Sequence, residues 1–235
     1  MKKLLFGFCA ALSLFALVAC GGDDDAGNGN GNGNGGGGSG PTSSAGSDAT
    51  PTAEDLERLS TIDIPGFTRS DSRVIASAAN ALYTSTEETA GGANILVTVR
   101  VAGCDPFICG TLDPKDYEDA EAQRNLKSVL STALIESPGL VWDFGSTELA
   151  PGKTGLHTYA AGYLETTEAS GTSRVSANAY RAWYHDGNLH IYIEAFQRGG
   201  DSPQSLDDVT TLMSMAEAEK AAKDVFAAFA PEFGK

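Results

Sequence analysis

Hydrophobic residues recur along much of this chain with a period of about two, which is typical of half-buried β-strands. The clearest example is the run Ile95, Val97, Val99 and Val101. The same criterion predicts strands at residues 79–87, 94–101, 140–149, 156–166, 174–185 and 189–197. Short connections join the last four, so these strands must be antiparallel, because a parallel crossover needs a longer connection.

The strongest hairpin signal is Asp186-Gly187-Asn188, which stands between the last two predicted strands. Asp-Gly between alternating runs favours a tight turn, because glycine tolerates a positive φ. If Gly187 and Asn188 are the two central residues of the turn, His185 and His190 face each other across the hairpin, ~5 Å apart at Cβ. A three-residue loop would shift this pairing.

A helical period appears in three other segments. Thr52-Ala53-Glu54-Asp55 resembles a capping box and predicts a short helix to about Leu59. Asp113-Pro114 predicts the start of a long helix that ends before Ser137-Pro138-Gly139. Its apolar stripe consists of Tyr117, Ala120, Leu126, Val129, Leu130, Ala133 and Leu134.

The last helix is predicted to begin with the capping box Ser214-Met215-Ala216-Glu217 and to stop at Pro231. The order of elements is then a short helix, two strands, a long helix, four strands and a closing helix. We therefore predict an α+β fold, in which one antiparallel β-sheet has two main helices packed on it.

This order of elements resembles the PsbP-like sandwich found in many exported proteins. The shared points are the opening hairpin, the central helix, the strand meander that ends in Asn188–Ile193, and the closing helix with Val225–Phe229. The resemblance covers most of residues 62–230. It implies an adaptor or binding role in the cell envelope. The family has no universal catalytic residue that could be assigned to this chain.

The amino terminus has the three parts of a secretory signal peptide: Met1-Lys2-Lys3, the apolar Leu4–Ala16, and small residues before Cys20. The apolar part is too short for an ordinary membrane-spanning helix. Leu17-Val18-Ala19-Cys20 resembles the lipobox of bacterial lipoproteins. That resemblance implies cleavage after residues 1–19, a diacylglycerol thioether on Cys20 and an acyl chain such as palmitate on the new amino group. A plain secretory peptide that ends in Ala-Cys is the alternative.

Residues 20–51 consist mainly of Gly, Asn, Asp, Ser and Thr, so they cannot bury enough apolar surface to offset the entropy of ordering. We expect a disordered tether that spans roughly 30 Å and carries a single domain of residues 52–235. The residue that follows the lipidated cysteine is Gly21, which resembles the pattern of lipoproteins that are sorted to the outer membrane. The sequence leaves open whether the domain is on the periplasmic or the surface face.

Two cysteines remain in the predicted domain after Cys9 is removed with the signal peptide and Cys20 is lipidated. Cys104 and Cys109 are five residues apart, and an even pair in an exported domain predicts a disulfide. Closing so short a loop constrains the unfolded chain modestly, so we expect ~2 kcal/mol of stabilisation at most.

The net charge of −15 excludes nucleic acid as a partner, because binding phosphates needs clustered lysines and arginines. It also argues against direct binding of anionic lipid headgroups. The expected contact with the membrane is the N-terminal lipid, and the expected partner is an envelope protein, a glycan or a peptide.

Candidate chemistry is sparse, and no catalytic residue or cofactor is predicted. Gly152-Lys153-Thr154 lacks the earlier glycine and the strand-to-helix setting of a P-loop. His185 and His190 could bind zinc or copper, although a stable site wants three or four ligands. Two of the carboxylates Glu165, Glu168 and Glu194 could form a glycosidase pair, which would make the protein a hydrolase.

Aromatic residues gather in the β-rich half, and four of them are candidates for a binding face: Tyr180, Trp183, Tyr184 and Tyr192. Both faces of strand 174–185 carry aromatics. One face would lie under the helices, and the other is either a binding groove or the floor of a second covering layer. We expect a non-enzymatic envelope lipoprotein with a binding or scaffolding domain. The alternatives are an envelope hydrolase and a metal-binding accessory protein.

Overall fold

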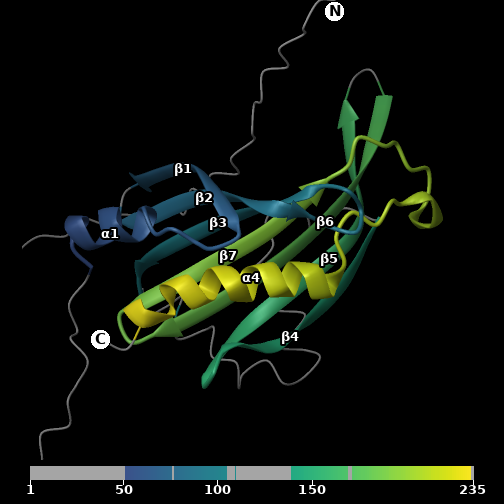
Figure 1. Ribbon diagram of the computed structural model, residues 1–235. Helices are drawn as coiled ribbons and strands as arrows, with labels where there is room; N and C mark the ends of the chain where they lie inside the picture. The colour runs from purple at the N-terminus through teal and green to yellow at the C-terminus, as the bar shows by residue number, and fades with distance from the viewer. Residues whose placement is uncertain (1–50, 76, 105–108, 110–138, 169–170, 234–235) are drawn as a thin grey trace, which may run out of the picture. The chain divides into compact units, whose positions relative to one another are not determined.

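Seven strands form one antiparallel sheet in the order β1-β2-β3-β7-β6-β5-β4 (Figure 1). The computed structural model describes residues 51–75, 77–104, 109, 139–168 and 171–233. The strands are β1 Phe67–Ile75, β2 Ala78–Glu88, β3 Asn94–Gly103, β4 Leu140–Ala150, β5 Lys153–Glu168, β6 Gly171–Asp186 and β7 Leu189–Arg198. The predicted antiparallel sheet is therefore confirmed.

Six of these strands coincide with the predicted ones to within three residues at either end. The seventh, β1, was not predicted, because its sequence Phe67–Ile75 places polar residues on both faces. It pairs with β2 at the edge of the sheet, and its register shifts between Arg69 and Asp71. A polar, bulged strand is common at a sheet edge and carries almost no period-two signal.

The described residues also form two α-helices and two short 3-10 helices. These are α1 Ala53–Ser60, α4 Met215–Phe229, η2 Leu206–Asp208 and η3 Ala230–Glu232. Both α-helices begin at the capping boxes that the sequence predicted, with Thr52 and Ser214 as N-caps. The predicted helix of residues 113–137 lies outside the described residues. So do the predicted signal peptide, Cys20 and nearly all of the tether.

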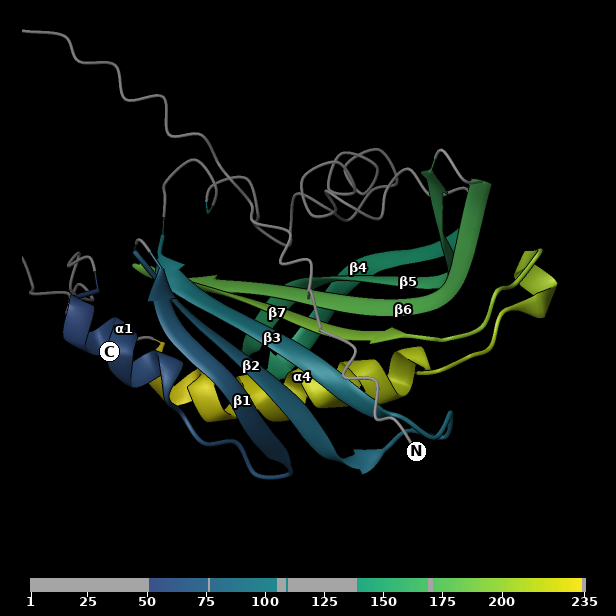
Figure 2. The same cartoon turned by 90° about the horizontal axis from the view of Figure 1, so that it is seen from above.

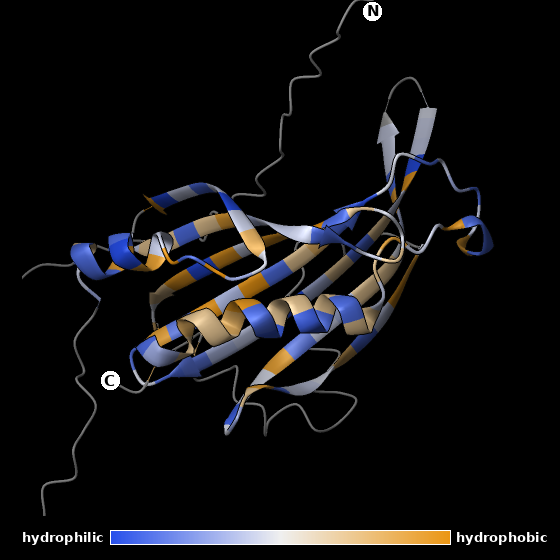
Figure 3. Ribbon diagram, viewed as in Figure 1, coloured by the Kyte–Doolittle hydropathy of each residue, from blue (hydrophilic) through white to orange (hydrophobic). Residues whose placement is uncertain are grey.

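Both helices lie on the same face of the sheet (Figure 2). Helix α4 places Ala218, Ala222, Val225 and Phe226 against it, all of them 0% exposed. Beneath them, alternate residues of the central strands point toward the helix, among them Val97, Tyr180 and Ile193. Hydrophobic and hydrophilic residues accordingly alternate along the strands (Figure 3). We call this side of the sheet the helix face.

No helix among the described residues has the length and hydrophobicity needed to cross a membrane.

Candidate functional site: the second face of the sheet and its disulfide

The face of the sheet away from α4, which we call the second face, carries a row of large polar and aromatic side chains. Strand pairing aligns Arg100 of β3 with Tyr192 of β7, and Tyr192 with Trp183 of β6. In the next row of this face, Arg181 of β6 is opposite Glu194 of β7. These residues alternate with the core residues that point toward α4, which explains why they share the second face.

An ion pair between a buried arginine and a part-buried glutamate lies at the centre of the second face. Arg181 donates from Nη2 and Nε to Glu194 Oε1, at 2.8 and 3.2 Å, and its side chain is only 7% exposed. The Tyr192 hydroxyl donates to Glu194 Oε2 at 3.1 Å. Burial, followed by the charge of Glu194, raises the pKa of Tyr192 well above 10. Tyr192 is thus a neutral donor that helps to hold the carboxylate in place.

Three buried donors of the second face have no hydrogen-bond partner within the part of the chain that the structure describes. They are Arg100 Nε, Arg181 Nη1 and Trp183 Nε1. A buried N–H group without an acceptor costs free energy, and such groups are rare in native proteins.

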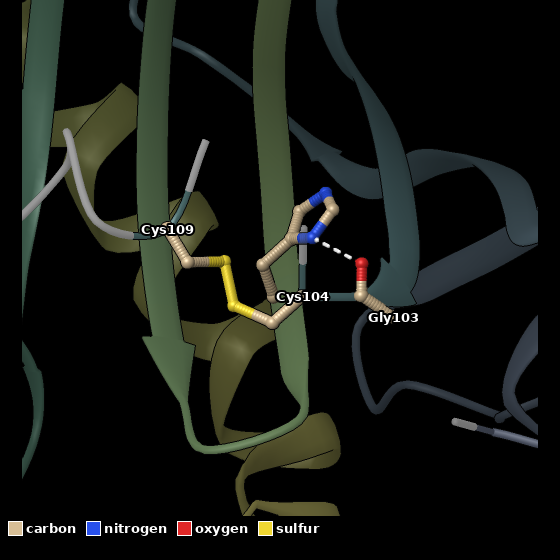
Figure 4. The surroundings of a disulfide bond; sticks show 4 residues. Gly103, Cys104 and Cys109 are labelled. Carbon is tan, nitrogen blue, oxygen red and sulfur yellow. Dashed lines mark hydrogen bonds between the residues drawn. A yellow bond between two sulfur atoms is a disulfide. The ribbon is translucent and has the colours of Figure 1, made fainter. Parts of the chain in front are cut away.

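The predicted disulfide between Cys104 and Cys109 is present at the end of this face (Figure 4). A ring nitrogen of His190 lies within 4.8 Å of both sulfurs, and His190 Nδ1 donates to the carbonyl of Gly103 at 3.1 Å. The ring of Trp183 stacks on His190, with centroids 6.1 Å apart. The disulfide therefore lies at the end of β3, next to the start of β7.

The hairpin pairing of the two histidines is also as predicted, since His185 is opposite His190 in the register of β6 and β7. However, among the described residues, the potential ligand atoms that come together within 4.8 Å belong to Cys104, Cys109 and His190, and not to His185. Because thiolates are the ligands and these two sulfurs are bonded to each other, the cluster cannot hold a metal in this redox state.

The four candidate binding aromatics do not share a face, which corrects the sequence-based grouping. Trp183 and Tyr192 lie on the second face, whereas Tyr180 is 0% exposed beneath α4. The ring of Tyr184 meets Phe226 and Phe233 edge-on, with centroids 5.1 and 5.3 Å away. Strand alternation separates the even from the odd positions of β6, so Tyr180 and Tyr184 are core residues.

Two of the three candidate carboxylates form ion pairs with arginines. Glu165 accepts from Arg174 Nε at 2.8 Å, and Glu194 accepts from Arg181. Strand alternation places Glu165 and Glu194 on opposite faces, so these two do not form a glycosidase pair. The side chain of Glu168 lies outside the described residues.

Sequence reasoning missed a polar cluster beneath α4. The ring of His157 stacks on Tyr180, with centroids 5.5 Å apart, and neither of its ring nitrogens has a hydrogen-bond partner in the described part of the chain. Nearby, the Thr147 hydroxyl donates to Glu219 Oε1 of α4 at 2.7 Å. Burial lowers the pKa of His157 despite the opposing charges of Asp143 and Glu219. The histidine is therefore held neutral in the core.

Comparisons with known proteins return nothing: no family model, no curated protein and no solved structure matches this chain.

Proposed function

We propose that this chain is a lipid-anchored protein of the bacterial cell envelope and that its domain binds or scaffolds another envelope component. The observation that carries the proposal is the run Leu17-Val18-Ala19-Cys20 after a charged and apolar leader. Each buried CH₂ of an acyl chain contributes ~0.8 kcal/mol of membrane affinity, so two or more chains on Cys20 form a stable anchor. The tether then lets the domain reach a partner away from the bilayer.

The anchor is tested by labelling bacteria that express the full chain with a clickable palmitate analogue. We expect the wild-type protein to take up the label, to start at Cys20 by mass spectrometry and to fractionate with membranes. The Cys20→Ser variant should lose the label and the membrane association. Cys104→Ser is the matched control, which keeps both. A mature wild-type chain without acyl mass would overturn the proposal.

The two edges of the sheet suggest where the domain meets its partner. Edge strand β1 is protected by Arg69, Asp71, Arg73 and a bulge, which are common devices against pairing with another strand. The first half of the other edge strand, β4, is mainly apolar and carries one charged residue, Asp143. Val141 is 62% exposed, and on the opposite face the rings of Trp142 and Phe144 stack 5.8 Å apart.

An exposed edge strand with apolar side chains is a surface to which a partner can add a strand. We therefore assign partner binding to the Val141 half of β4. A photo-crosslinking residue at Val141 in intact cells is expected to capture an envelope protein, and the same residue at Thr68 of β1 is the control. Capture of nothing at Val141, together with turnover of an ester or a glycan by the purified protein, would favour the hydrolase.

The proximity of Cys104, Cys109 and His190 favours a second candidate, the metal-binding accessory protein. A dithiol reductant would convert the disulfide to two thiols, which lose their protons as they bind zinc. Competition with a chromophoric zinc chelator then measures uptake by the reduced chain. His190→Ala should abolish this uptake, whereas His185→Ala, on the paired strand, should retain it. No zinc uptake by the reduced wild type would remove this candidate.

A further inference from the structure

A histidine of β5 lies where helix α4 meets the sheet near its β4 edge. The ring of His157 stacks on Tyr180 of β6, with centroids 5.5 Å apart. Toward β4, the ring extends over the paired residue Gly145, where an added Cβ would be 3.2 Å from the ring Cε1. Glycine at this position therefore leaves the space that the ring occupies.

Helix α4 covers this part of the sheet. The Thr147 hydroxyl of β4 donates to Glu219 Oε1 of α4 at 2.7 Å. Strand alternation places Gly145 and Asp143 on the same face of β4 as Thr147, so the helix lies on the face that carries the ring. Glu219 also forms an ion pair with Lys223, one turn further along α4, at 2.9 Å.

The surroundings of His157 do not favour its protonated form. Neither ring nitrogen has a hydrogen-bond partner in the described part of the chain. Burial is the largest effect and lowers the pKa of His157, Asp143 and Glu219 oppose this effect, and Lys223 adds to it. The pKa of Tyr180 is raised by burial, and that of Glu219 is lowered chiefly by its bond to Lys223. Neither of these two groups therefore changes its charge near pH 6.

Of the three histidines in the chain, only His157 lies on the helix face. His185 and His190 pair with each other on the second face, at the hairpin of β6 and β7. Histidine is the side chain whose ordinary pKa lies between pH 5 and pH 8. A change of pH in this range therefore acts on the contact between α4 and the sheet through His157.

The two halves of α4 are held to the sheet unequally. The buried residues are small in the first half and large in the second: Ala218, Ala221 and Ala222, then Val225, Phe226 and Phe229. Stabilisation by burial grows with the apolar area that is removed from water. Separating the first half of the helix therefore costs less than separating the second half, and it breaks none of the hydrogen bonds between strands.

We infer that protonation of His157 loosens residues 218–223 of α4 from the sheet, so that the helix responds to acid before the strands separate. Once this part of the helix lifts, water solvates the charged ring, and the open state binds the proton more tightly than the closed state. The population of the open state then rises as the pH falls below about 6.5. This response goes beyond the proposed function and does not depend on the lipid anchor.

The test is hydrogen exchange with mass spectrometry at pH 7 and pH 5.5, on the full chain purified in detergent. Protection factors, in which each rate is compared with the intrinsic rate at the same pH, remove the direct effect of pH on exchange. One proton bound only in the open state lowers protection by at most about eightfold. We expect a several-fold fall for peptides that cover residues 218–223 and little change for peptides of β3 and β7.

Two variants identify the titrating group. His157→Phe keeps a ring against Tyr180 but binds no proton, so it should abolish the fall. His185→Gln replaces a histidine of the second face, and as the matched control it should retain the fall. Circular dichroism checks folding, and His157→Gln repeats the test if His157→Phe does not fold.

Three results would overturn the inference. An equal fall in the wild type and in the His157 variant, or its loss in His185→Gln, would place the titrating group elsewhere. An equal fall in α4 and in the central strands would show that the whole domain opens. Unchanged or higher protection of α4 at pH 5.5 would show that Asp143 and Glu219 hold the protonated ring in place. None of these results bears on the acylation of Cys20.

Discussion

At the scale of single residues, His157 shows how burial controls chemistry in this domain. It is 7% exposed, its ring stacks on Tyr180, and burial is the main cause of its lowered pKa. Asp143 and Glu219 raise this pKa and Lys223 lowers it, so the surrounding charges partly cancel. The folded state therefore favours the neutral form of the His157 ring.

This lowered pKa predicts acid sensitivity. The unfolded chain has the ordinary value near 6.5, so below about pH 6.5 the unfolded state binds a proton that the native state does not. The free energy of unfolding should therefore fall as the pH drops below 6.5, until the native pKa is reached. His157→Phe preserves the stack and should flatten this part of the profile. Urea unfolding of both chains between pH 5 and pH 7 measures the profiles, and the same pH dependence of the unfolding free energy in the wild type and in the variant would contradict the assignment.

The Arg181–Glu194 pair predicts an asymmetric response to substitution. Arg181→Ala leaves the Glu194 carboxylate, which is 24% exposed, without its cationic partner and should lower the free energy of unfolding by about 1–3 kcal/mol. Replacing both residues, as Arg181→Met with Glu194→Leu, removes both charges at similar volume and should cost far less. Chemical denaturation of the two variants measures the difference. A double variant as unstable as Arg181→Ala would show that the ion pair itself stabilises the fold.

At the scale of elements, the capping box of α4 does more than start a helix. Ser214 Oγ accepts from the Glu217 backbone at 3.2 Å, and Glu217 accepts from the Ser214 backbone at 2.8 Å. The second carboxylate oxygen of Glu217 accepts from the backbone of Ala90 at 2.8 Å. These bonds lower the pKa of Glu217, with the Ala90 bond as the largest cause. The cap thus joins α4 to the turn between β2 and β3.

Removing this cap tests its contribution. Ser214→Ala should lower the free energy of unfolding by about 1 kcal/mol, because the backbone N–H of Glu217 loses its acceptor. Urea denaturation at pH 7 measures the change. Ser202→Ala, in the exposed loop before η2, is the control and should change stability little. A loss at Ser202 equal to that at Ser214 would show that capping is not the cause.

At the scale of the whole molecule, the predicted tether and the domain should be energetically independent. A segment of Gly, Asn and Ser buries no apolar surface, so it adds nothing to the stability of the sheet. The Cys20→Ser chain and the same chain without residues 21–51 should melt within about 1 °C of each other. Calorimetry provides the measurement, and a difference of several degrees would mean that the tether packs on the domain.

Strand alternation and capping boxes made much of the fold predictable. Both signals are local, because they depend on residues two to four positions apart. The run Ile95–Val101 and the box at Ser214 each define an element without reference to the rest of the chain. Strand β1 escaped prediction because an edge strand with two polar faces has no such period.

The site was less predictable. Sequence separation identified the pairing of Cys104 with Cys109, and the tight turn at Gly187 identified the pairing of His185 with His190. Neither signal could show that His190 lies beside the disulfide, since β3 and β7 become neighbours only when the sheet forms.

The sequence by itself determined most of the described strands and helices and their turns, and it gave the expected location of this protein, because period, capping and the lipobox depend on near neighbours. Only the tertiary structure decided which face each aromatic occupies, which arginine meets Glu194, and that His157 is buried beneath α4. The reason is that these facts depend on strand order and register, which residues far apart in the chain set together.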